Sequence, residues 1–129
     1  MVAVISCSHF PDDERIYHRE ISALLEKNYV IKYFTLSDLK TNLSQPGIDH
    51  KNYDLSKVTS DEYLECVEKD LIKEPPKVVH IHEPELFPVA IKMKKLFNTK
   101  IVYDVHEDYI SMIDTFSRLI WPLKNIKIK

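Results

Sequence analysis

The chain of 129 residues contains a single glycine, Gly47. Dinucleotide-binding fingerprints, P-loops and nucleophile elbows each need two or more glycines at fixed spacing, because the backbone there turns sharply or approaches a phosphate closely. None of these motifs is therefore present. The length corresponds to about one domain. With 44% hydrophobic and 29% charged residues, the composition indicates a folded globular chain rather than a disordered or fibrous one.

Charge and cysteine content narrow the function further. A net charge of −2 argues against a nucleic-acid binder, which would carry a basic excess. Cys7 and Cys66 are too few for a disulfide framework or a cysteine-based zinc site. The first residues, MVAVISCSHF, lack the basic region of a signal peptide, and no window has the roughly 18 apolar residues of a membrane span. We expect a reduced, cytoplasmic domain.

Apolar runs alternate with amphipathic stretches along the chain. The runs predict strands at residues 2–7, 29–35, 77–82 and 100–106, with an irregular edge strand near 48–53. Helices are expected after a cap at Asp12 or Asp13, from Thr59 or Ser60 to the prolines at 75–76, and from Pro84 onward. This order predicts the α/β class: an open, mostly parallel, Rossmann-like sheet with helices on both faces.

Polar residues follow three of the predicted strands. These pairs and triplets are Ser8-His9, His82-Glu83 and His106-Glu107-Asp108. Ligands of open parallel sheets bind beyond the carboxyl ends of the strands. We therefore expect these histidines and carboxylates to gather along one edge of the sheet.

Several chemistries are compatible with such an edge. His82, His106 and a carboxylate could ligate zinc or iron, although the spacing matches no known ligand set and we assign no metal ligand. A nucleophilic Cys7–histidine pair is disfavoured because a cysteine inside an apolar strand is usually inert. A phosphate-accepting receiver domain is excluded because its acidic pair and lysine are missing after the corresponding strands. A stand-alone binding module and a metal-dependent hydrolase stay as alternatives.

Two segments carry a family resemblance. HFPDDERIYHREISALLEKNYVIKYFT and VVHIHEPELFPVAIKMKKLFNTKIVYDVHEDY contain Asp13-x-Arg15-Ile16, His80-x-His82-Glu83 and Tyr103-Asp104-x-His106-Glu107 in that order. Over roughly residues 1–110 the chain resembles the N-terminal domain of family 4-like glycosyltransferases of the GT-B fold. The resemblance implies transfer of a sugar from a nucleotide-sugar to a carbohydrate or lipid-linked acceptor.

The resemblance also implies roles for individual residues. His106 matches a histidine near the transferred sugar and is the expected catalytic residue. Residues expected on the acceptor side are His9, Asp13, Arg15, His82, Glu83, Glu107 and Asp108. For Arg15, an ion pair with a nearby carboxylate is the alternative. The chain itself is expected to bind no cofactor and to be inactive alone, because the nucleotide-sugar belongs to a C-terminal domain supplied in cis or in trans.

Alternation along the strands predicts a structural pair. His80 and His82 lie on one face of their strand, and Asp104 lies on the corresponding face of the next. A buried carboxylate needs a partner, so we expect His80 to contact Asp104 and both to be structural.

We divide the chain into an incomplete N-terminal domain, residues 1–117, and a basic apolar tail, residues 118–129. The tail carries Arg118, Lys124, Lys127 and Lys129 and no acidic residue. Such a segment suits peripheral contact with the inner membrane face, or packing on the domain. An incomplete sheet leaves exposed edges, so a homodimer is also expected.

Overall fold

The computed structural model describes residues 1–8, 10–39, 42–105 and 126–128. These form one six-stranded sheet with the order β3-β2-β1-β4-β5-β6, in which every neighbouring pair is parallel. The strands are β1 (Val2–Ile5), β2 (Ile31–Ser37), β3 (Ile48–Asp54), β4 (Val78–Ile81), β5 (Lys100–Tyr103) and β6 (Ile126–Ile128). The α/β class with an open parallel sheet, predicted from the sequence, is confirmed.

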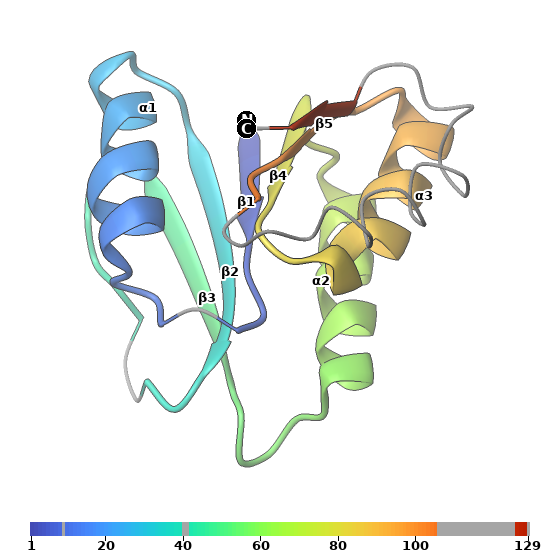
Figure 1. Cartoon of the computed structure of the whole chain (residues 1–129), viewed down its shortest axis with the longest axis horizontal. Helices are drawn as coiled ribbons and strands as arrows, with labels where there is room; N and C mark the ends of the chain where they lie inside the picture. Colours follow the sequence, from blue (N-terminus) through green and yellow to red (C-terminus); the bar gives the residue numbers. More distant parts are fainter. Residues whose placement is uncertain (9, 40–41, 106–125, 129) are drawn as a thin grey trace.

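Helices cover both faces of this sheet (Figure 1). The π-helix η1 (Glu14–Ile21) runs directly into α1 (Ser22–Glu26) and lies on one face. The helices α2 (Ser60–Lys73) and α3 (Phe87–Phe97) lie on the other, with the short 3-10 helix η2 (Pro84–Leu86) preceding α3. None of the helices in the described part of the chain has the length and apolar character needed to cross a bilayer.

Strand alternation sorts the core into two layers. Ala3 and Ile5 of β1 face α2 and α3, where they pack with buried residues such as Tyr63 and Met93. Val2 and Val4 face the opposite way and pack under Ile16 and Ile21 of η1, among others. The layer under η1 is the smaller one, and it contains His80 and His50 on the same side of the sheet.

Both predicted helix caps are present. The Asp13 carboxylate accepts hydrogen bonds from the backbone N–H groups of Arg15 and Ile16, each at 2.9 Å. Thr59 and Glu62 form a reciprocal capping box at the start of α2. These side chains satisfy N–H groups that have no partner inside the helix, so each helix begins where the sequence predicts.

Three elements differ from the expectation. β3 is a regular strand, paired with β2 over seven consecutive residue pairs, although it does form an edge. The first helix begins as a π-helix rather than an α-helix. Residues Ile126–Ile128 form β6 beside β5, so this part of the predicted tail extends the sheet. The other tail residues, 118–125 and 129, lie outside the described residues, as does the proposed boundary after residue 117.

Candidate functional site

The second half of the sheet brings together the segments that carry the family resemblance. Ile81, the last residue of β4, pairs with Tyr103, the last residue of β5. The backbone N–H of Asp104 continues this ladder by donating to the carbonyl of Ile81 at 3.0 Å. His82 and Asp104 are therefore the first residues beyond the carboxyl ends of adjacent strands.

Asp104 is the centre of the resulting cluster. Its carboxylate is 1% exposed and accepts a hydrogen bond from Arg15 Nη2 at 2.5 Å through Oδ1. Its other oxygen, Oδ2, lies 3.6 Å from Nδ1 of His82. Arg15 thus forms an ion pair with a nearby carboxylate, as expected for one of its two predicted roles, and its contact with substrate stays a prediction.

His80 contacts a different carboxylate from the predicted one. Its Nε2 lies 3.0 Å from Oε2 of Glu20, and its ring stacks on that of His82 with centroids 4.6 Å apart. The strand register explains the difference. His80 pairs with Val102, two residues before Asp104, so the prediction had the correct face of the strand but the wrong partner along it.

Glu20 is the residue that the sequence analysis missed. In an α-helix, residues five apart point about 140° away from each other. In the π-helix η1 they align instead: Arg15 Nε lies 3.7 Å from Glu20 Oε1, and both side chains reach the same cluster. Ile16 and Ile21 are both fully buried and also lie five residues apart. This spacing is the sequence feature that could have indicated the π-helix.

Glu83 is buried and ties the ends of two strands together. One carboxylate oxygen accepts a hydrogen bond from the hydroxyl of Ser6 at 3.1 Å, and the other accepts from the backbone N–H of Cys7. Its carboxylate therefore holds β1 to β4. Asp13 is likewise engaged, in the cap of η1.

Cys7 is a poor nucleophile in this setting. Burial, and then the negative charge of Glu83, raise the pKa of the Cys7 thiol far above its usual range. The thiolate is the reactive form of cysteine. This raised pKa favours the protonated thiol, which argues against a nucleophilic Cys7–histidine pair.

Several predicted site residues lie outside the described residues. These are the proposed catalytic His106 and the proposed acceptor-binding His9, Glu107 and Asp108. Their roles stay predictions.

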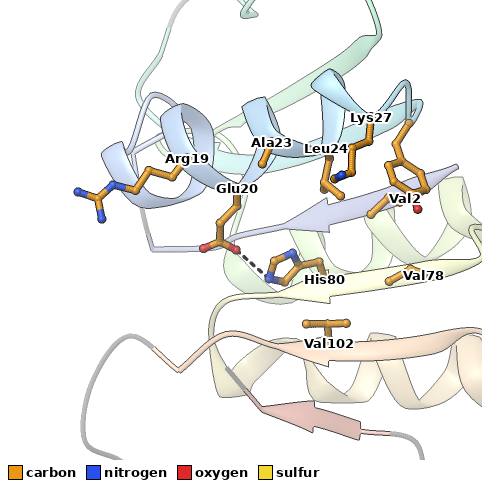
Figure 2. Close-up of a pocket in the computed structure, with 10 residues that line it drawn as sticks. Val2, Arg19, Glu20, Ala23, Leu24, Lys27, Val78, His80 and Val102 are labelled. Carbon is orange, nitrogen blue, oxygen red and sulfur yellow. Dashed lines mark ion pairs between the residues drawn. The ribbon is translucent and has the colours of Figure 1, made fainter.

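Two pockets adjoin the strands that carry these residues. One, of about 440 Å³, lies between the η1–α1 helix and the sheet, and Glu20 and His80 form one end of its wall. Figure 2 shows these two side chains facing each other across the gap between helix and strand, with Val78 and Val102 on the sheet. The other, of about 210 Å³, lies on the α2 side at the carboxyl ends of the strands. It is lined by Cys7, Ser8, Ser60, Leu64 and Glu85.

No protein-family model matches the chain, and no curated protein matches it. Among solved structures, the chain is similar to the crystal structure of LpCGTa in complex with UDP, with 14% sequence identity and a TM-score of 0.49. The match covers 95% of this chain and 34% of that one. The chain thus spans about a third of the length of that structure.

Proposed function

We propose that this chain is the acceptor-binding part of a glycosyltransferase, which transfers a sugar from a nucleotide-sugar to a carbohydrate or lipid-linked acceptor. The observation that carries the proposal is that the three motifs behind the family resemblance meet in space. Arg15 of the first motif bonds Asp104 of the third, and His82 of the second motif contacts the same carboxylate. Segments almost 90 residues apart are thereby joined at the ligand-binding edge of the sheet.

The pocket on the α2 side suits a sugar acceptor. It is lined by the exposed side chains of Ser8, Ser60 and Glu85 at the carboxyl edge of the sheet. Ser8 follows β1, Ser60 begins α2, and Glu85 lies in η2. Hydroxyl and carboxylate groups both suit sugar hydroxyls. A serine hydroxyl can donate and accept a hydrogen bond, and a carboxylate is a strong acceptor. At about 210 Å³ the pocket fits one end of an acceptor rather than a whole oligosaccharide.

The donor belongs elsewhere in this proposal. Phosphate groups need cationic side chains or converging backbone N–H groups. The loop after β1 instead carries Asp12 and Asp13, and Asp13 already receives the free N–H groups of η1. The nucleotide-sugar is therefore assigned to a separate donor-binding domain, and His106 is assigned to support the reacting sugar in the cleft between the two.

Ligand-observed saturation-transfer NMR on the full chain tests this assignment. The probes are a set of mono- and disaccharides, a polyprenyl-phosphate-linked sugar in micelles, and the donors UDP-glucose and GDP-mannose. We expect saturation transfer to at least one acceptor and none to the donors. Glu85→Gln should weaken the acceptor signal, whereas Glu65→Gln, an exposed position in the middle of α2, should not. Tight binding of a nucleotide-sugar, with no signal from any carbohydrate, would overturn the proposal.

A further inference from the structure

We propose that Glu20, His80, His82 and Asp104 form a binding site for a divalent transition-metal ion, with zinc as the best fit. These four side chains come from η1, β4 and the turns that follow β4 and β5. Each offers one ligand atom, and these atoms all lie within 4.8 Å of one another. The site goes beyond acceptor binding and does not depend on it.

Two of the distances between ligand atoms are close to those of a four-coordinate site, and the others, none above 4.8 Å, would have to shorten when an ion binds. Ligand atoms around tetrahedral zinc lie about 3.3 Å apart, given metal–ligand bonds of about 2.0–2.1 Å. The His80–Glu20 and His82–Asp104 pairs, at 3.0 and 3.6 Å, bracket this value. Two imidazoles with two carboxylates are a ligand set that zinc accepts, whereas magnesium prefers six oxygen ligands.

The surroundings hold these side chains in place. His80, His82 and Asp104 are buried, and the two rings are stacked against each other. Arg15 bonds Oδ1 of Asp104 and leaves Oδ2 on the side of His82. Such an outer partner fixes the orientation of a ligating carboxylate. The two carboxylates offset the charge of a divalent ion, and Arg15, whose side chain is 43% exposed, keeps its own positive charge partly in solvent.

A pocket adjoins the site on one side. Glu20 and His80 form part of the wall of the 440 Å³ pocket between the helix and the sheet (Figure 2). A bound ion would join η1 to β4 and β5 across the smaller of the two core layers. The expected consequence is a metal-dependent gain in the stability of this layer.

Isothermal titration of the metal-free full chain with zinc, under reducing conditions, tests the site. We expect one equivalent of zinc to bind and to raise the thermal midpoint, with no effect of magnesium. Cobalt should give the visible absorption of a four-coordinate site. Glu20→Gln and His82→Gln should each weaken zinc binding at least about tenfold, by removal of one of four ligands.

The controls separate this site from adventitious binding. His18→Ala removes an exposed histidine on the same helix, and Cys7→Ser with Cys66→Ser removes both thiols. Zinc affinity should be unchanged in both. Circular dichroism confirms that each variant folds, and Glu20→Gln is the most conservative of the set. The proposal is overturned if the folded chain binds no zinc, or if Glu20→Gln and His82→Gln bind it as tightly as the original sequence.

Discussion

Two buried histidines occupy the same face and the same row of the sheet, yet their surroundings differ in kind. His50 pairs with Tyr33, Tyr33 with Val4, and Val4 with His80, so the two histidines lie on either side of a shared apolar centre. Each is 4% exposed. Burial alone therefore does not distinguish them, and the difference lies in the groups that each ring meets.

His50 belongs to a neutral hydrogen-bonded network. The backbone N–H of Leu43 donates to its Nδ1 at 2.7 Å, which leaves Nε2 to donate to the Thr35 hydroxyl at 2.8 Å. That hydroxyl donates onward to Asn52. Burial lowers the pKa of His50 to about 4. Such a ring is already occupied at both nitrogens and has no capacity left for a ligand.

His80 and His82 meet carboxylates instead of neutral groups. Glu20 and Asp104 bring negative charge to the two rings, and Arg15 partly balances it. The charge of the neighbouring groups therefore distinguishes a histidine that stabilises the fold from one that can bind a cation. We expect His50 to be purely structural and the His80–His82 pair to be functional.

The largest expected effect is that of Asp104→Ala. This change removes the carboxylate beside the buried His82 and the shortest ion pair of Arg15, and it should lower the free energy of unfolding by about 2–4 kcal/mol. Asp49→Ala, at an exposed position beside His50, should change it by no more than about 0.5 kcal/mol. Urea denaturation of both variants measures the difference. Equal, small losses would show that the ionic cluster is not a stability element.

A pH series tests the lowered pKa of His50. The pKa of His50 is about 4 in the folded chain, against an ordinary value of 6.5, so the unfolded chain takes up a proton first as the pH falls. The contribution of His50 to the free energy of unfolding should be fully present above pH 6.5. It should fall by about 1–3 kcal/mol as the pH decreases from 6.5 to 4. His50→Gln should remove that part of the slope. A stability difference between the two proteins that is independent of pH would contradict this account.

A smaller effect is expected from Gly47→Ala, which acts on the His50 side alone. Gly47 has a φ of +88°, and an added Cβ would lie 2.9 Å from Leu25 Cδ2. The left-handed backbone costs an L-residue about 1–2 kcal/mol, and the contact adds strain at the start of β3. Asn28→Gly, at a φ of 63°, should be neutral or slightly stabilising in the same melts. If alanine is tolerated at position 47, the entry to β3 is less constrained than the structure indicates.

Sequence patterns predicted most of the fold because its elements follow local rules. Apolar runs marked the strands that became β1, β2, β4 and β5, and Thr59 marked the start of α2 through a local cap. The partners of the two histidines did not follow from alternation. The contact of His80 with Glu20 depends on the π-register of η1. The contact of His82 with Asp104 depends on the register between β4 and β5. The partners of a side chain across elements are set by register, which alternation alone leaves undetermined.

One NMR experiment can test whether His50 is structural while His80 and His82 bind a metal ion. Long-range proton–nitrogen spectra of the full chain labelled with ¹⁵N-histidine report every imidazole ring, with His50→Gln and His82→Gln providing assignments. We predict that His50 carries its proton on Nε2 and is unchanged by one equivalent of zinc, while the nitrogen signals of His80 and His82 shift together. Unshifted His80 and His82 signals, or a zinc-dependent shift of His50, would contradict the claim.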